Sequence, residues 1–161
     1  MFKHLLLPTD GSELSEVAIR LGIEFAKATK AKITGFYVIP EFHIFTYRTE
    51  MLEDTRERYA NDCQVHAAQY LGVIERAAKE AGVPAETANA IHDHPYEAII
   101  KAAQERGCDL IVMASHGRRG VQGVLLGSET QKVLTHSQIP VLVCRSDRLG
   151  AQDSGEEFGH A

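Results

Sequence analysis

Residues 109–130 constrain the fold of this chain more than any other stretch, because an apolar run there leads into a glycine-rich loop. The run, residues 110–113 (LIVM), has the composition of a short buried parallel strand. The loop after it contains Gly117, Gly120, Gly123 and Gly127. A helix is predicted to begin at Ser128, where outward-pointing N–H groups and about half a positive charge from the helix dipole would attract an anion.

This loop does not match the two commonest phosphate-binding motifs. The phosphate loop G-x-x-x-x-G-K-[ST] is absent, since the sequence contains no Gly-Lys pair. The dinucleotide motif G-x-G-x-x-G is absent as well. The residue pattern alone therefore leaves two interpretations open: a loop that binds a nucleotide, and a loop of several left-handed turns without a ligand.

The composition indicates one globular domain in the cytoplasm. The chain has 161 residues, of which 44% are hydrophobic and 24% charged. No apolar run approaches the roughly 20 residues of a membrane span, and no signal-peptide layout is present. The formal net charge is −5 and the longest basic block is Arg118-Arg119, so no nucleic-acid partner is expected. The odd, widely spaced Cys63, Cys108 and Cys144 are predicted to be buried or half-buried free thiols.

Strands and helices are predicted to alternate along the chain. The expected strands are residues 4–9, 33–39, 85–92, 110–113 and 139–144. The first expected helix starts directly after Asp10-Gly11-Ser12 and is closed by residues 29–32, and the second runs from about residue 51 to residue 81. The third is opened by Asp93 or by His94 and ends near Gly107, and a fourth starts at Ser128. This alternation predicts an α/β fold with a Rossmann-like, doubly wound five-stranded parallel sheet of order 3-2-1-4-5 and helices on both faces. The domain is expected to span residues 1–146, and residues 147–161 are expected to form a flexible tail.

Two blocks of sequence resemble the universal stress protein family. LLLPTDGSE resembles its first strand and turn, and ASHGRRGVQGVLLGSETQKVL…IPVLVCR resembles its nucleotide-binding half. The ATP-binding branch of that family carries G-x-x-G, nine residues, then G-[ST]. Here the frame is Ala114-x-x-Gly117, nine residues, then Gly127-Ser128, so Ala114 replaces the first glycine. The resemblance extends from Phe2 to Arg145.

The resemblance implies an ATP-binding homodimer with a stress-related or regulatory role and a protein partner that the residues do not identify. It places on the adenosine side Pro8, Thr9, Asp10 and Val38. It places around the ribose and phosphates Met113, Ala114, His116 and Gly117. It places on the phosphates Gly127, Ser128, Glu129 and Thr130.

The chemistry of individual side chains leaves alternatives open. A carboxylate only accepts hydrogen bonds, so Asp10 suits a ribose hydroxyl or adenine amino group better than a phosphate, unless Mg²⁺ bridges it to the phosphates. Asp10 with Glu13, or Ser12 alone, is instead a cap for the first helix. Ser128-x-x-Gln131 has the capping-box pattern.

Two histidine features complete the candidate groups. His116 is either a phosphate donor or a turn residue. His92-x-His94 lacks an evident third ligand, so no metal site is predicted.

The sequence alone leaves three candidate functions. The leading one is a dimeric nucleotide-sensing module, and the others are a slow ATPase and a nucleotide-free dimeric interaction protein. No catalytic residue is assigned, because an efficient phosphoryl-transfer enzyme needs a water-activating base or an arginine finger and neither is evident. The dimer is predicted to form through the fifth strand, whose uncharged residues 141–143 would lie at an open sheet edge. The alternative is a monomer whose tail covers that edge.

Overall fold

The computed structural model describes residues 1–41, 50–116 and 126–145, with the side chains of residues 50–54 excepted. Its strands are β1 (His4–Thr9), β2 (Lys32–Ile39), β3 (Ala85–Ile91), β4 (Leu110–Ala114) and β5 (Val141–Cys144). Its helices are α1 (Glu13–Thr29), α2 (Glu50–Ala81), α3 (Pro95–Glu105) and α4 (Ser128–His136). Gly117 and the expected tail, residues 147–161, lie outside the described residues.

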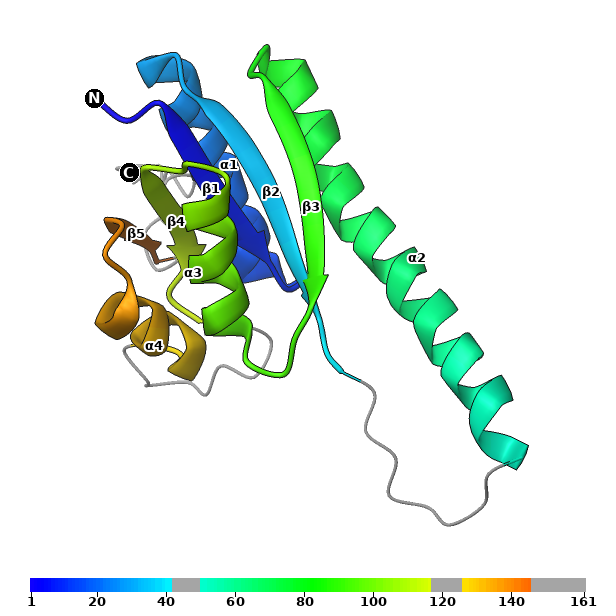
Figure 1. Ribbon diagram of the computed structural model, residues 1–161. Coiled ribbons are helices and arrows are strands. Elements are labelled where there is room, and N and C mark those ends of the chain that lie inside the picture. Colours follow the sequence, from blue (N-terminus) through cyan, green and yellow to red (C-terminus); the bar gives the residue numbers. More distant parts are fainter. Residues whose placement is uncertain (42–49, 117–125, 146–161) are drawn as a thin grey trace, which may run out of the picture.

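The five strands form one parallel sheet in the order β3-β2-β1-β4-β5, which confirms the predicted fold class and strand order (Figure 1). β1 lies at the centre and is buried along its whole length. β2 and β4 flank β1, with Leu5 in register with Ile33 on one side and Leu110 on the other. The strand order therefore reverses between β1 and β4, where doubly wound sheets hold their ligands.

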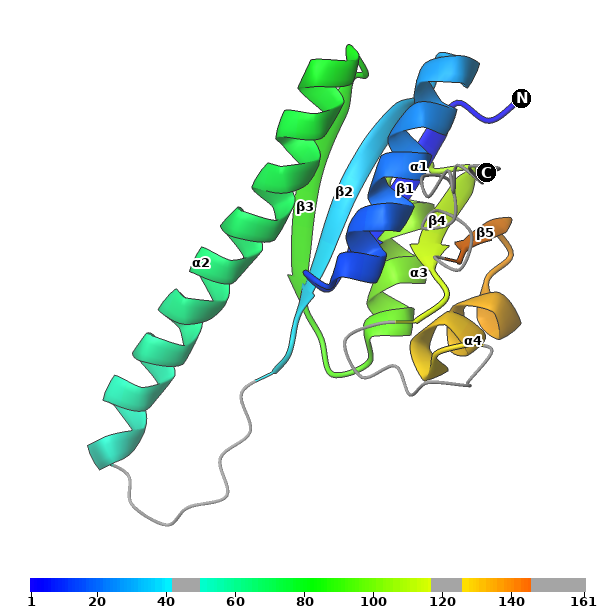
Figure 2. The same cartoon turned by 180° about the vertical axis from the view of Figure 1, so that it is seen from behind.

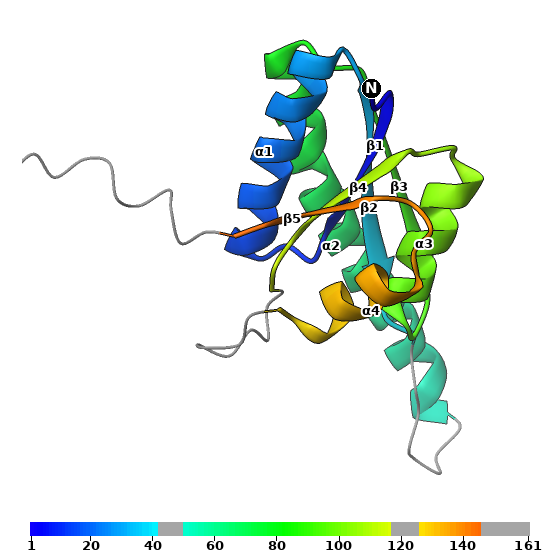
Figure 3. The same cartoon turned by 90° about the vertical axis from the view of Figure 1, so that its left-hand side faces the viewer.

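Helices cover both faces of this sheet. α1 and α2 lie on one face, and α3 and α4 lie on the other (Figures 2 and 3). Side chains of β1 alternate between the two layers: Leu5 and Leu7 join the core under α1 and α2, whereas Leu6 joins the core under α3. Burial on both faces explains why β1 reads as a continuous apolar run.

Small differences from the predicted boundaries have local causes. β5 begins at Val141 and not at residue 139, since Pro140 has no N–H for a ladder bond. β4 continues to Ala114, which pairs in register with Cys144. Ser12 is the N-cap of α1, and its hydroxyl oxygen accepts a hydrogen bond from the Ser15 N–H at 3.2 Å. The cap alternatives for α1 are thus resolved in favour of Ser12.

Helix α2 is much longer than the sheet it packs against. It has 32 residues, about 48 Å at about 1.5 Å per residue, and its first turns project beyond the sheet (Figure 1). No side chain from residue 55 to residue 66 is buried. Burial begins at Ala67 and recurs at Leu71, Ile74 and Ala78, the spacing of a helix that packs through one face.

A polar network closes the amino end of the sheet, opposite the switch-point loops. His4 is only 4% exposed, and its Nε2 lies 2.7 Å from Thr34 Oγ1. The Thr34 hydroxyl donates its single proton to Glu86 at 2.9 Å, so Nε2 of His4 is the donor to Thr34. Burial lowers the pKa of His4 from its ordinary 6.5, and the nearby Lys32 ammonium acts in the same direction.

The stability of the fold is expected to decrease as the pH falls below about 6.5. In that range the unfolded chain binds a proton at His4 that the folded chain resists, so acid favours unfolding. The pKa of Glu86 is lowered by its hydrogen bond from Thr34. Protonation of that carboxylate therefore destabilises the fold only at more acidic pH. Urea unfolding at pH 7.5 and pH 5.5 measures the effect. His4→Gln keeps a donor toward Thr34 without titrating and should reduce the difference; an equal difference in both proteins contradicts the assignment.

Candidate functional site

The carboxyl ends of β1 and β4 lie at the same edge of the sheet, at the lower end of the strands in Figure 1. β1 is followed by α1, and β4 is followed by α4. β1 and β4 are hydrogen-bonded neighbours in a parallel sheet, so both strands end at the same switch point. The predicted residues at these strand ends are therefore brought together: Pro8, Thr9, Asp10, Met113, Ala114 and His116.

The turn after β1 is fixed by its own side chains. Thr9 Oγ1 accepts a hydrogen bond from the Gly11 N–H at 3.1 Å, and Asp10 Oδ1 accepts one from the Ser12 N–H at 2.9 Å. Gly11 has φ +75°, a conformation that glycine adopts without strain. Thr9 is 8% exposed and also lies 3.2 Å from the Ser15 hydroxyl. Its hydroxyl is therefore engaged inside the turn, while Asp10 combines the turn contact with a position at the carboxyl edge of the sheet.

Helix α4 is tied to the end of β4 by two hydrogen bonds. Thr130 Oγ1 donates to the Ala114 carbonyl at 2.9 Å, and the Gly127 N–H donates to the Ser115 carbonyl at 2.6 Å. The Ser115 N–H in turn donates to the Cys144 carbonyl of β5 at 2.9 Å. Thr130 is 3% exposed, so its side chain is a structural anchor that places the helix start at the switch point.

The predicted capping box at Ser128 and Gln131 is wrong. Gly127 is the N-cap of α4, Ser128 is already helical, and no side-chain hydrogen bond caps this end in the described chain. The bonds from Gly127 and Thr130 to the end of β4 accompany an N-cap that lies one residue earlier than the capping-box pattern predicts, while Ser128 is the first helical residue, as expected. Among the described residues, the first N–H groups of α4 have no side-chain cap, the condition in which a helix N-terminus binds an anion.

His116 adds a second donor-capable group next to this helix start. Its Nδ1 lies 3.1 Å from the Ser115 hydroxyl. Its Nε2 is buried and finds no hydrogen-bond partner among the described residues. Buried polar atoms in folded proteins are usually paired, so this nitrogen has the capacity for one further hydrogen bond. His116 follows Ser115 in the chain and Gly127 is hydrogen-bonded to it, so both residues lie beside Ser115.

The side chain of Glu129 serves a different purpose from the predicted phosphate contact. Its Oε2 accepts a hydrogen bond from the Tyr96 N–H at 2.9 Å, and its Oε1 accepts one from Lys132 Nζ at 3.0 Å. His94, the N-cap of α3, makes no side-chain cap bond, so Glu129 supplies an acceptor for the first turn of α3 from another helix. This arrangement turns the negative carboxylate toward α3 and leaves the Glu129 N–H at the start of α4.

The remaining predicted residues lie on the strands. Pro8 and Met113 are buried, and Val38, at the end of β2, is half-buried and packs against the core under α3. Sequence reasoning did not single out Ser115, whose carbonyl and N–H link β4, β5 and α4. The only signal for it was its position between the strand and the glycine-rich loop.

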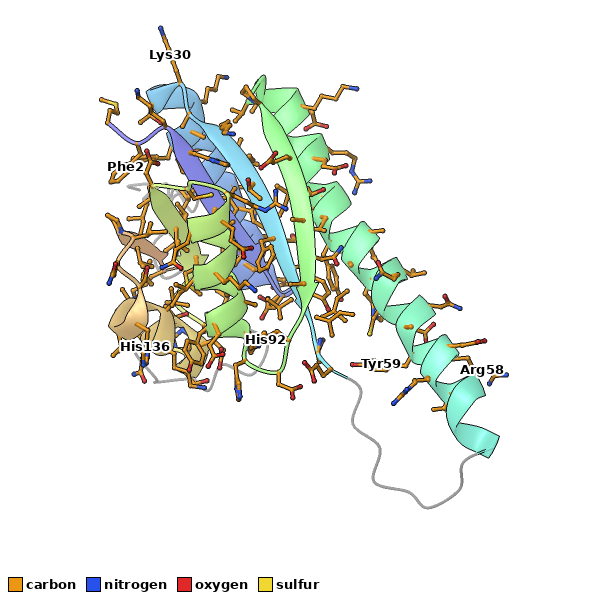
Figure 4. The ribbon with its side chains drawn as sticks, viewed as in Figure 1. Phe2, Lys30, Arg58, Tyr59, His92 and His136 are labelled. Carbon is orange, nitrogen blue, oxygen red and sulfur yellow. The ribbon has the colours of Figure 1, made fainter. Side chains whose placement is uncertain are left out.

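Neither a metal centre nor a membrane segment is found in the described ranges. Within residues 1–41, 50–116 and 126–145, no three His, Cys, Asp or Glu side chains gather as metal ligands. His92 Nδ1 accepts the His94 N–H at 2.9 Å, and His92 follows the carboxyl end of β3 (Figure 4). No helix of this part of the chain is both long enough and apolar enough to cross a bilayer.

Together, the sheet and its switch-point loops define a doubly wound α/β protein with a candidate anion site at a glycine-capped helix. The chain belongs to the universal stress protein family, whose match covers residues 1–145. It is 32% identical over 149 residues to universal stress protein YxiE of Bacillus subtilis, covering 90% of this chain and 100% of that protein.

Two solved structures extend the comparison. The structure of protein MJ0577 of Methanocaldococcus jannaschii is similar with a TM-score of 0.75 and 30% identity, covering 91% of this chain and 97% of that one. A universal stress protein crystallised in complex with cAMP is similar with a TM-score of 0.64 and 26% identity, covering 89% of this chain and 97% of that one.

Proposed function

We propose that this protein binds an adenine nucleotide, with ATP as the preferred ligand, and acts as a dimeric nucleotide-sensing module of the cytoplasmic stress response. The observation that carries the proposal is the start of α4, which within the described ranges has neither a side-chain cap nor, at the nearby buried His116 Nε2, a hydrogen-bond partner. Both features are satisfied by phosphate oxygens. The similar universal stress protein in complex with cAMP supports adenine as the base. The three free thiols fit a reducing compartment.

The strand positions support separate groups of residues for the phosphates and for the adenosine part of the nucleotide. The N–H groups of Ser128, Glu129 and Thr130 hold the phosphates, with His116 as an additional donor. Pro8, Thr9, Asp10 and Val38 line the adenosine side, and Met113 and Gly117 border the ribose and phosphates. Mg²⁺ accompanies ATP if the Asp10 carboxylate reaches the phosphates through the ion.

Ala114 is compatible with this proposal despite replacing a glycine of the motif. Along β4, Met113 contributes to the core under α3, so strand alternation turns the Ala114 methyl group toward α1 on the opposite face. The Ala114 carbonyl accepts the hydrogen bond from Thr130. The methyl group therefore points away from α4.

Mass spectrometry and calorimetry test the proposal on the purified protein. Denaturation should release an adenine nucleotide, and titration of nucleotide-free protein should give tighter binding of ATP than of GTP. Adenosine and tripolyphosphate, titrated separately, report the two halves of the site. A protein that releases no nucleotide and binds none of these ligands at millimolar concentration would be a nucleotide-free interaction protein.

Asp10→Asn is expected to weaken ATP and adenosine by the same factor, about tenfold, the value of one hydrogen bond to a charged group. Asparagine keeps an oxygen that accepts the Ser12 N–H, so the turn after β1 is retained while the charge and one acceptor are lost. Calorimetric titration of both ligands measures the two ratios. A variant that loses affinity for ATP but keeps its affinity for adenosine would place Asp10 on the phosphates or on Mg²⁺ instead.

A further inference from the structure

The turn that carries Asp10 is packed from behind by a residue of α2. A Cβ atom built on Gly11 would clash with Cε1 and Cζ of Tyr70, which leaves no room for a side chain while the ring is there. Gly11 also has φ +75°. The Tyr70 ring therefore fills the space that a side chain at residue 11 would occupy, and it bears directly on the backbone of the turn.

Tyr70 is itself held by two other rings. Tyr37 of β2 meets it edge-on, with ring centroids 5.4 Å apart and an interplanar angle of 62°. His66, one turn earlier on α2, stacks on it at 6.0 Å and 21°. Tyr37 is the register partner of Thr9, the residue before Asp10. Three aromatic rings thus connect β2 and α2 to the turn after β1.

The Tyr70 ring contacts Gly11, the residue of the turn with the greatest backbone freedom. Gly11 lies between Asp10 and Ser12, and the Asp10 carboxylate accepts a hydrogen bond from the Ser12 N–H. Glycine has the widest backbone freedom, so internal hydrogen bonds alone leave the turn less rigid than a packed one. A ring pressed against Gly11 restricts that freedom and thereby fixes the direction of the Asp10 carboxylate.

We propose that Tyr70 is a positioning residue for nucleoside recognition, which it supports by holding the Asp10–Gly11 turn through ring packing. The inference rests on the proposed function, since it assigns the adenosine half of that site a dependence on α2. Tyr70 acts through Gly11 and does not contact the ligand. Affinity for the nucleoside is accordingly controlled from the helix layer on the face of the sheet opposite α4.

Calorimetry on Tyr70→Ala, Tyr70→Phe and the control Val65→Ala tests this role. Val65 lies on α2 and its side chain is exposed. Tyr70→Ala should weaken ATP and adenosine by the same factor, about tenfold. Tyr70→Phe should restore wild-type affinity, and Val65→Ala and binding of tripolyphosphate should be unchanged. A folded Tyr70→Ala with wild-type affinity overturns the proposal, as does a Tyr70→Phe that is as weak as Tyr70→Ala.

Amide hydrogen exchange separates this inference from the proposed function, because it needs no ligand. Tyr70→Leu keeps an apolar side chain on α2 and serves if Tyr70→Ala does not fold. The Ser12 amide should exchange at least about tenfold faster in this variant, whereas the Leu6 amide in the centre of the sheet should not change. Unchanged exchange at Ser12 refutes the packing role of Tyr70. Faster exchange in a protein that binds no nucleotide would refute the proposed function, and with it the recognition role, while leaving the packing contact established.

Discussion

Gly127→Val is expected to abolish ATP binding while leaving the fold intact. Gly127 has φ −69° and ψ 154°, an extended conformation that valine accepts, and its N–H bond to the Ser115 carbonyl does not depend on the side chain. The added isopropyl group would stand directly before the N–H groups of Ser128 and Glu129, where phosphate oxygens must approach closely. Calorimetry should give no detectable heat of ATP binding, and circular dichroism should give a thermal melt close to that of the wild type.

The matched control for this variant is Gly72→Val. Gly72 lies in α2, and a Cβ atom there meets nothing within 4 Å. The same chemical change at that residue should leave the affinity for ATP unaltered. A folded Gly127→Val that binds ATP as tightly as Gly72→Val would show that the phosphates are held elsewhere.

Val143→Pro is expected to convert a homodimer into a monomer. Ile111 N–H donates to the Pro140 carbonyl and Ser115 N–H donates to the Cys144 carbonyl, so the backbone groups of residues 140, 142 and 144 face β4. By alternation, the N–H groups of Val141 and Val143 face away from β4, where no further strand pairs with β5 in the described residues. Two copies that meet there about a two-fold axis would pair these groups, and a proline at residue 143 removes one donor from each copy.

Light scattering at micromolar concentration checks this expectation. The wild type should have twice the mass of one chain, and Val143→Pro should have the mass of one. Val143→Thr is the control, because threonine keeps the N–H and a β-branched side chain. Proline at Leu142 would be less informative, since the N–H of Leu142 faces β4 and its loss would weaken the sheet itself. A wild-type monomer, or a proline variant that stays dimeric, excludes an interface through β5.

The sheet could be predicted from sequence because each of its rules is local or topological. The buried runs of β1 and β4 are continuous because both faces are covered, and alternation with helices leaves few possible strand orders. The first residue of α4, Ser128, could be predicted from the sequence, but its cap could not. Ser128-x-x-Gln131 satisfies a capping pattern, whereas Gly127 is the N-cap and donates a hydrogen bond to the end of β4.

The candidate site could be predicted only in part from the sequence, for the same reason. Asp10 and the glycine-rich loop are marked by residue type and spacing. The contact between Gly11 and Tyr70 is not, because helical periodicity places Tyr70 on α2 without indicating which turn of the sheet its ring meets. Likewise, Glu129 has the position of a phosphate contact, but its carboxylate turns to the Tyr96 N–H on α3, a residue far away in the sequence. Residue type predicts what a group can bind, and packing decides which way it points.

The length of α2 has a consequence for which part of the molecule unfolds locally. Its outer turns, residues 55–66, are joined to the rest of the helix by backbone hydrogen bonds but bury no side chain. Melting these turns would therefore expose little apolar surface and would leave the sheet closed, whereas melting the turns from Ala67 onward would open the core. Tyr70 lies at the boundary between these two regimes. The local stability of α2 is thus lower in residues 55–66 than from Ala67 onward. The less stable segment ends one turn before Tyr70, whose ring holds the Asp10–Gly11 turn.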